Sequence, residues 1–540
     1  MILNTHIGAK VEPLNPMTLT ALAAGSTVGY SLAGSWGTSR VFPVIEYSTD
    51  GGSTWSVMVK DTPITLANIG DSIQLRSSTG DNFAYTSSVY TKITGTGQLK
   101  LSGNLLSMQQ DFAYHQKFTS YGFMGLFRAN TAIVDASEFI PRVQALSKTY
   151  SLGYLFYGCT SLVTGCQIPD NYVDPNGLSS VGSCYYDFFY GCSSMTSGPD
   201  RLPCKYATKS MYYNMFYNCT ALQKAPEIDV EFVEVAANSA SAFNGMFYGC
   251  AALVEPPSVI KLKILGSSCC SAMFQKCTSL AVAPVWILDD AADVIGGTSV
   301  FTSCFNGCTS LVRGALFSHP LTNEMCPSTR SGIFNSMYLG CTGLTTAPNL
   351  NVAPGFIAPG TAFQKMFNNC TGITMPPADF GNLGGVDSTG GSIFEAMFSG
   401  CSSLREAPNM AFLPATIGTK CCYQMFQNCT SLATAPATLS ATTLGTQSYT
   451  QMFYGCSALT KGPDIMATSL STNGMSAMFY GCTSLTSVKI YYTGVFATST
   501  SGTTGNWMNG VNTVGTLYYR GSDRTKGASA IPTNWSVSSF

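Results

Sequence analysis

The hydrophobic pattern of the chain repeats over most of its length. From about residue 124 to 486, a unit of the form M-F-x-x-C-x-x-L recurs, usually with a proline seven residues after the cysteine. Twelve cysteines mark the copies at separations of 26 to 33 residues, and a degenerate copy with Asn130 in the cysteine place leads them. Such self-similarity predicts a solenoid whose stacked coils bury a continuous core.

Three columns of the repeat are expected to face inward. The residue three before the cysteine is always aromatic, and the residue three after it is always apolar. A small side chain in the cysteine place can turn inward and hydrogen-bond backbone at the bend, a role that Asn130 could share. This predicts a structural ladder of buried thiols at Cys159, Cys192, Cys219, Cys250, Cys277, Cys308, Cys341, Cys370, Cys401, Cys429, Cys456 and Cys482.

The residues around each cysteine predict two elements per coil. The segment before it, such as MYYNMFYNC (211–219), has apolar residues at i, i+3 and i+4, which predicts a short helix or 3₁₀ turn. The run after it, such as ALQKAP (221–226), is expected to be extended and to stack into a parallel sheet. The prediction is an α/β solenoid of about 13 coils over residues 111–486.

The repeat resembles the BspA-type leucine-rich repeat in its M-F-x-x-C-T-S-L variety. The letters CTSL stand intact in five copies, for example at 159–162 and 482–485. This resemblance covers about two thirds of the chain and implies a leucine-rich-repeat solenoid. It also implies a surface protein of gut anaerobes or of their phages, with adhesion or protein binding rather than catalysis as its role.

The segments before and after the repeats have different patterns of apolar and polar residues. Short alternating runs separated by Gly, Ser and Asp predict a small β-sandwich or barrel over residues 17–110. It contains one Asp-box, STDGGSTW (48–55), which predicts a hairpin. Residues 487–540 are expected to form a β-rich cap, with Trp507 and Trp535 covering the last coil. Residues 1–16 show no secretory signal pattern and are expected to be an attachment segment.

Composition and chemistry weigh against several classes of function. Charged residues make up 10% of the 540 residues and the net charge is −1, so nucleic-acid binding is not expected. The chain has no apolar run of 18 residues, so membrane insertion is not expected either. The three histidines, His6, His115 and His319, lie in no triad or metal pattern. We therefore expect neither catalytic residues nor a metal or cofactor.

One position of the repeat is not explained by burial in the core. The position after the core aromatic residue holds tyrosine in six copies and mostly polar residues in the others. Two interpretations stay open: a surface for protein or glycan contact, or a half-buried edge of the turns. The candidate binding residues are Tyr157, Tyr190, Tyr217, Tyr248, Tyr454 and Tyr480.

These observations favour a non-enzymatic recognition or display protein. The favoured setting is the surface of a phage virion, as a fibre or decoration protein that contacts a protein or glycan of a host cell, or neighbouring virion proteins. Oligomers are possible. The main alternative is an extracellular adhesin on a bacterial cell surface. A glycan-active enzyme is a weaker alternative, because it rests on the single Asp-box, which elsewhere is a folding device.

Overall fold

The computed structural model describes most of the chain. Its described residues are 15–34, 43–78, 83–108, 121–142, 150–169, 182–202, 206–228, 231–232, 240–262, 264–288, 294–387, 391–497, 502–527 and 530–540. The expected attachment segment therefore lies outside the described residues, apart from its last two positions. So do His6 and His115. Two compact units, Met1–Val230 and Glu231–Phe540, divide the chain.

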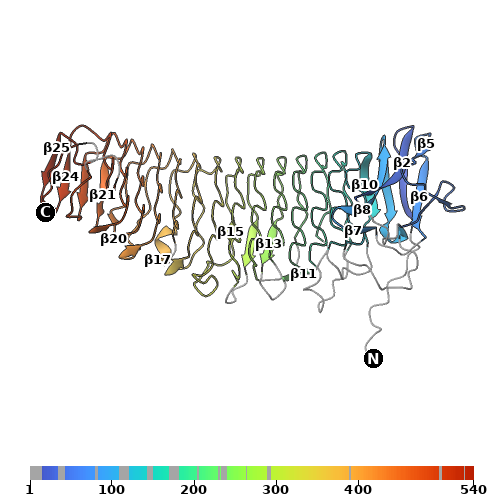
Figure 1. The fold of residues 1–540 in the computed structure, drawn as a ribbon, viewed down its shortest axis with the longest axis horizontal. Coiled ribbons are helices and arrows are strands. Elements are labelled where there is room, and N and C mark those ends of the chain that lie inside the picture. The colour runs from blue at the N-terminus through green and yellow to red at the C-terminus, as the bar shows by residue number, and fades with distance from the viewer. Residues whose placement is uncertain are drawn as a thin grey trace, which may run out of the picture. The chain divides into compact units, whose positions relative to one another are not determined.

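The first unit begins with antiparallel strands. One sheet has the order β10-β9-β1-β6-β3-β4, and a second has the order β5-β2-β8-β7. Figure 1 shows several of these strands, among them β2, β5 and β6, as blue arrows. Buried and half-exposed residues alternate along β1 and β8, as expected for strands with one face on a core. The bounds are β1 (Met17–Ala21), β2 (Ser26–Ala33), β3 (Ile45–Ser48), β4 (Ser56–Val57), β5 (Ile64–Leu66), β6 (Ser72–Ser77), β7 (Ala84–Thr86), β8 (Val89–Thr96), β9 (Leu99–Asn104) and the 3₁₀ helix η1 (Leu105–Met108).

Strand β10 (Ile133–Ile140) connects this antiparallel part to the repeats. It belongs to the first coil, yet it pairs in parallel with β9. The Asn130 side chain donates to the Ile93 carbonyl of β8 at 3.1 Å and accepts from the Ala132 amide at 2.9 Å. The first coil thus continues the hydrogen bonding of the antiparallel strands.

The segments before the repeat cysteines are consecutive tight turns. In the coil that ends at Cys192, every second amide donates to the next coil, as Tyr185 does to the Met211 carbonyl at 3.0 Å. The amides between them donate three residues back, as Phe188 does to the Tyr185 carbonyl at 3.3 Å. No α-helix occurs in the described ranges, so the helical alternative for this segment and the α/β character of the solenoid are not found, and turns closed by bonds three residues back stand there instead.

The reason for this difference is a left-handed residue at every fourth position. Ser183, Asp187 and Gly191 have φ of 60°, 53° and 70°, and the same spacing recurs in the other coils. An α-helix needs right-handed φ and ψ at every residue, so one left-handed residue in four interrupts it. The resulting turns bury pairs of residues four apart, such as Met211–Tyr212 and Met215–Phe216.

Each unit buries a ladder of aromatic rings. Phe127, Phe156, Phe189 and Phe216 stack in the first unit at centroid distances of 5.2, 5.5 and 5.5 Å. In the second unit the same column is stacked at 5.3–5.7 Å at every step. Its members are Phe247, Phe274, Phe305, Tyr338, Phe367, Phe398, Phe426, Phe453 and Phe479.

Short parallel strands complete the coils and make the fold a parallel β-solenoid. In the second unit they form the sheets β13-β14-β15, β16-β17, β18-β20-β22 and β19-β21-β23-β24-β25. The bounds are β11 (Tyr206–Ala207) in the first unit, then β12 (Glu231–Phe232), β13 (Val259–Leu262), β14 (Val285–Leu288), β15 (Leu316–Phe317), β16 (Phe356–Ala358), the 3₁₀ helix η4 (Phe380–Asn382), β17 (Leu383–Val386), β18 (Thr416–Ile417), β19 (Thr438–Leu439), β20 (Thr443–Leu444), β21 (Lys461–Ile465), β22 (Ser469–Leu470), β23 (Ser487–Ile490), β24 (Gly515–Tyr519) and β25 (Trp535–Ser538).

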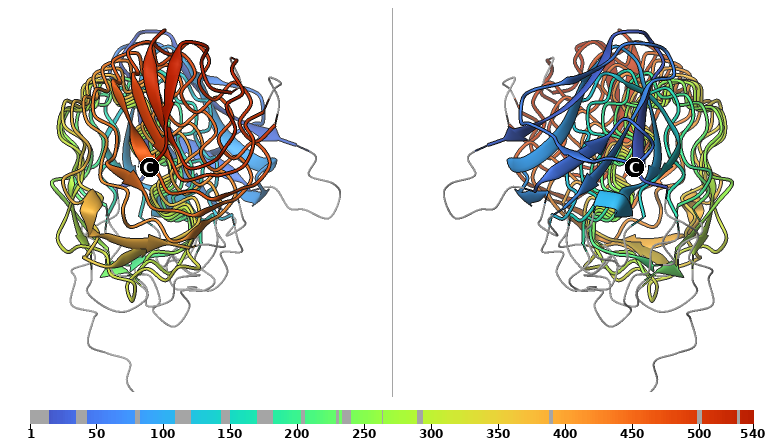
Figure 2. Two further views of the ribbon diagram at one scale, coloured as in Figure 1. Left: turned by 90° about the vertical axis from the view of Figure 1, so that its left-hand side faces the viewer. Right: turned by 90° about the vertical axis from the view of Figure 1, so that its right-hand side faces the viewer.

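The C-terminal segment extends this stack. Strands β23, β24 and β25 pair in parallel, and Figure 2 shows the last two side by side in red. Trp507 and Trp535 are buried, and their indole N–H groups donate to the carbonyls of Ala530 at 2.8 Å and Asn512 at 2.9 Å. Both tryptophans therefore join the core of the last coils with their polar atoms satisfied.

Candidate functional site

The structure places the twelve repeat cysteines in one fully buried position of the coil. The thiols of eleven of them donate to the backbone carbonyl of the aromatic residue one coil earlier, at 2.9–3.1 Å. The twenty cysteines within the described ranges are buried thiols rather than disulfides; Cys204 lies outside those ranges.

These thiols are poor candidates for chemistry. Burial raises the pKa of the Cys159 and Cys482 thiols to about 12, so they stay protonated and donate hydrogen bonds. Thiolates, not thiols, are the nucleophiles and metal ligands. Within the part of the chain that the structure describes, no cluster of three His, Cys, Asp or Glu residues is placed to hold a metal ion. His319 is exposed and contacts the Ser318 hydroxyl at 3.0 Å.

The six predicted tyrosines are all half-buried, and the structure groups them by unit. Tyr157, Tyr190 and Tyr217 form one stack in the first unit, with 4.7 Å between successive ring centroids. In the second unit, Tyr454 and Tyr480 stack at 4.7 Å, and the Lys276 ammonium lies 5.2 Å from the Tyr248 ring centroid. The rings of this column are therefore packed on each other and still partly exposed.

The first unit adds further tyrosines to the stack. Tyr186 and Tyr213 form a second stack at 4.7 Å, and Tyr154 lies between the two stacks, 5.7 Å from Tyr157 and 5.4 Å from Tyr186. We call the half-buried and mutually contacting set the tyrosine cluster. It comprises Tyr121, Tyr150, Tyr154, Tyr157, Tyr186, Tyr190, Tyr213 and Tyr217.

Two charged side chains lie next to the tyrosine cluster. The Arg128 guanidinium lies over the rings of Tyr157 and Tyr154, at 4.6 and 5.1 Å from their centroids. Asp187 is 7% exposed and accepts a hydrogen bond from the Asn214 side chain, while its Oδ1 has no hydrogen-bond partner. Burial raises the pKa of the Asp187 carboxyl to about 7, with Asn214 and Arg128 opposing the shift.

Asp187 and the second tyrosine stack were not among the residues predicted from the sequence. The predicted tyrosines lie two residues before the cysteine, whereas CYYDFFYGC (184–192) and MYYNMFYNC (211–219) also carry a Tyr six residues before it. A period of four along these segments would have placed both tyrosine columns outside the core. A helix has a period of 3.6 residues and would place different residues on the outer face. The helical interpretation therefore did not predict that both tyrosine columns lie outside the core.

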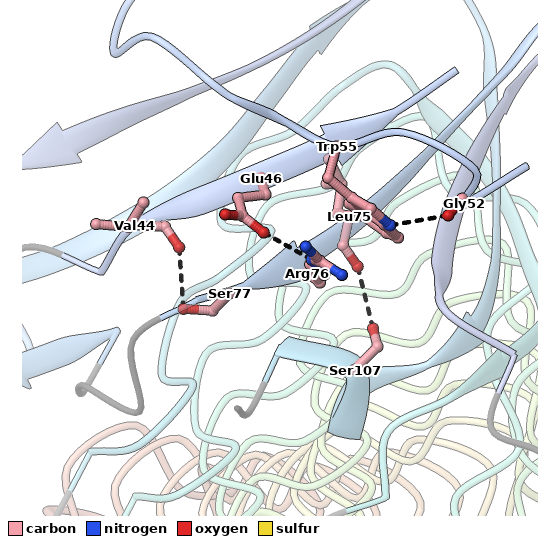
Figure 3. A network of polar contacts seen from close by, with 8 residues as sticks. All are labelled: Val44, Glu46, Gly52, Trp55, Leu75, Arg76, Ser77 and Ser107. Carbon is pink, nitrogen blue, oxygen red and sulfur yellow. Dashed lines mark hydrogen bonds and ion pairs between the residues drawn. The ribbon is translucent and has the colours of Figure 1, made fainter. Parts of the chain in front are cut away.

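The Asp-box forms the hairpin between β3 and β4, as the sequence predicted. Asp50 accepts hydrogen bonds from the Thr54 amide at 2.8 Å and hydroxyl at 2.6 Å, which hold the pKa of its carboxyl down at about 2. Figure 3 shows the Trp55 indole N–H donating to the Gly52 carbonyl, with the Arg76 guanidinium 4.1 Å from the ring. The hydrogen bonds stabilise the turn itself, and the Arg76 contact joins the hairpin to β6.

Comparisons with known proteins give little about function. No family model matches the chain, and no curated protein matches it either. Among solved structures, it is similar to a leucine-rich cell surface protein from Faecalibacterium prausnitzii A2-165, with 16% sequence identity and a TM-score of 0.30. That match covers 82% of this chain and 94% of the other. No helix in the described residues is long and apolar enough to cross a membrane.

Proposed function

We propose that this chain is a non-enzymatic recognition protein whose tyrosine cluster contacts another protein. The observation that carries the proposal is the arrangement of eight half-buried tyrosines on consecutive coils of the first unit. These tyrosines are half-exposed, whereas the inward position three residues before the cysteine in the same coils holds phenylalanine, such as Phe156 and Phe189. Tyrosine supplies large contact area and a polar atom at low entropic cost, which suits binding surfaces.

The stacking favours a protein partner over a glycan. The rings of Tyr157, Tyr190 and Tyr217 lie within 6° of parallel, so their faces are used against each other. Sugars usually pack on an open aromatic face, whereas a protein surface can contact ring edges and hydroxyls. We therefore take the edges of the tyrosine cluster as the contact surface.

A binding assay with single substitutions tests the proposal. Labelled full-length protein is added to candidate host cells, and bound protein is measured by flow cytometry. Tyr190→Ala should weaken binding by roughly tenfold, as expected for a central aromatic contact, while Tyr190→Phe separates the ring from its hydroxyl. Gln427→Ala, at the same repeat position in the second unit, is the matched control. Equal binding by all variants would contradict the proposal.

Treatment of the cells distinguishes the partner classes. Loss of binding after surface proteolysis supports a protein partner, and loss after glycosidase treatment alone supports a glycan and contradicts our choice. The setting is part of the same proposal: we favour a phage virion over a bacterial cell surface. Mass spectrometry of purified virions and of proteins released from intact bacteria decides between the two.

A further inference from the structure

The tyrosine cluster encloses one carboxyl group with incomplete hydrogen bonding. In the position that Asp187 occupies, the coil before has Tyr154 and the coil after has Asn214. Asp187 has a φ of 53°, and this position is left-handed in every coil. The backbone therefore fixes the direction in which the Asp187 side chain leaves the coil. Tyr186 is its neighbour in sequence and stacks on Tyr213 at 4.7 Å. The carboxyl group is thus nearly buried close to Tyr154 and Tyr186, with one amide as its partner.

An ionised carboxylate is costly at this place. Its Oδ1 is buried and has no hydrogen-bond partner, and an unpaired charge in such surroundings is strongly disfavoured. The charged and titratable groups that act on it are few: Arg128 attracts the carboxylate, whereas the hydroxyls of Tyr154 and Tyr186 are neutral near pH 7 because burial and the nearby carboxyl raise their pKa. No ion pair joins Asp187 to Arg128 or to another described base.

We propose that Asp187 is a pH-sensitive switch that sets the packing of the tyrosine cluster, an inference that rests on the proposed function of that cluster as a binding surface. With the proton on Asp187, the neutral acid stays between the rings and both stacks remain closed. When the proton leaves to solvent, the carboxylate requires water or a cation around Oδ1. Tyr154 and Tyr186 then have to move apart to admit it, and the surface changes shape.

The direction of the pH effect follows from linkage. The folded protein keeps the Asp187 proton up to about pH 7, whereas the unfolded chain loses it near the ordinary value of 3.8. The folded state therefore binds more protons between these two pH values, and its stability falls as the pH rises through this window. Above it the cost is constant. An amide cannot ionise, so Asp187→Asn should remove this part of the pH dependence.

The test follows the tyrosine bands of the full-length protein by near-ultraviolet circular dichroism from about pH 5 to about pH 9, a range below the titration of ordinary tyrosines. The wild type should show a transition with its midpoint near 7. Asp187→Asn should not show it, and the exposed Asp200→Asn should keep it. Arg128→Gln should move the midpoint to higher pH, because the attracting cation is lost. A buried carboxyl with a merely structural role would give no spectral transition.

Folding of the variants is checked independently. Asn214 already occupies the same position one coil later, and Asp187→Gly, which suits the positive φ, is the second variant. A wild type without a transition, or a transition that survives in both variants, overturns the switch. The binding assay is run at both ends of the pH range. If the protein binds at neither pH, the proposed function is rejected, and the spectral result alone decides whether Asp187 is a switch.

Discussion

At the scale of single residues, the coil depends on positions that ordinary side chains disfavour. Every coil has left-handed residues four apart, and glycine, asparagine and serine fill many of them, as at Gly158, Asn369 and Ser392. Larger residues occur there too, such as Lys365 with φ of 54°. Because an L-residue in this region costs roughly 1–2 kcal/mol, the packing and the hydrogen bonds between coils must exceed that cost at each turn.

Gly158 allows this cost to be measured by itself. Its φ is 70°, and a Cβ added there would meet no heavy atom closer than 3.9 Å. Gly158→Ala should therefore lower the free energy of unfolding by roughly 1 kcal/mol through backbone strain alone. Chemical denaturation measures it. Gly381→Ala is the control, because its Cβ also meets open space but its φ is not left-handed. Equal effects of both changes would contradict the strain argument.

The cysteine ladder gives a second prediction at this scale. The Cys401 thiol donates to the Phe367 carbonyl at 3.0 Å in a buried place. Cys401→Ala removes this donor and leaves the carbonyl with the Cys370 amide, at 3.1 Å, as its remaining partner, which should cost roughly 0.5–1.5 kcal/mol. Cys401→Ser keeps a donor of similar size and should cost less. If serine and alanine destabilise equally in thermal unfolding, the thiol acts by packing alone.

At the scale of elements, the sequence predicted the buried columns but not the conformation that presents them. The aromatic and cysteine columns lie in the core where the repeat placed them, because burial depends mainly on spacing along the coil. The segment before the cysteine was expected to be a short helix or 3₁₀ turn, since apolar residues at i, i+3 and i+4 fit a helical period. Pairs such as Cys269–Cys270 and Met273–Phe274 instead fit a period of four, which tandem turns require.

The stacked aromatic column predicts which coils lose stability when one coil is disrupted. Phe367 stacks between Tyr338 and Phe398, at 5.6 and 5.5 Å. Phe367→Ala should destabilise the second unit by roughly 3–5 kcal/mol, the usual range for a buried aromatic residue. Each coil contacts mainly its neighbours, so the loss of hydrogen-exchange protection should centre on residues 335–400. Unchanged protection in that range would contradict the stacking, and residues 440–490 serve as the internal reference.

At the scale of the whole chain, the antiparallel part is joined to the repeats more closely than its composition indicated. The sequence changes texture near residue 110, which predicts a domain boundary there. However, β9 lies before that point, β10 lies after it, and the two pair in parallel from Ile133↔Leu99 to Ile140↔Asn104. Composition shows which residues are polar or small. It does not show which strands distant in the sequence will pair with each other, as β9 and β10 do.

Removal of the antiparallel part should therefore expose the first coil. In a fragment of residues 111–540, residues 121–142 lose their bonds to β8 and β9, such as Leu99 amide to Ala132 carbonyl at 2.8 Å. Their amides should exchange much faster than in the full chain, while protection of 391–497 should persist. A fragment that begins at residue 15 keeps β9 and is the control. Full protection of 121–142 without β9 would show that the coil is stable alone.

The direction of the thiol bonds has a consequence for how the first unit assembles. Each repeat cysteine donates backward, to the coil that precedes it: Cys159 to Phe127 and Cys192 to Phe156. A new coil can satisfy its cysteine only after its predecessor has formed, and in the first coil the Asn130 side chain donates in the same way to the Ile93 carbonyl of β8. The thiol bonds therefore favour growth from the antiparallel strands toward the C-terminal side, the order in which a ribosome releases the chain, while backbone amides such as that of Tyr185 pair only with the coil that follows. Each new coil thus offers the next one a row of unpaired amides, so synthesis and folding can advance in step.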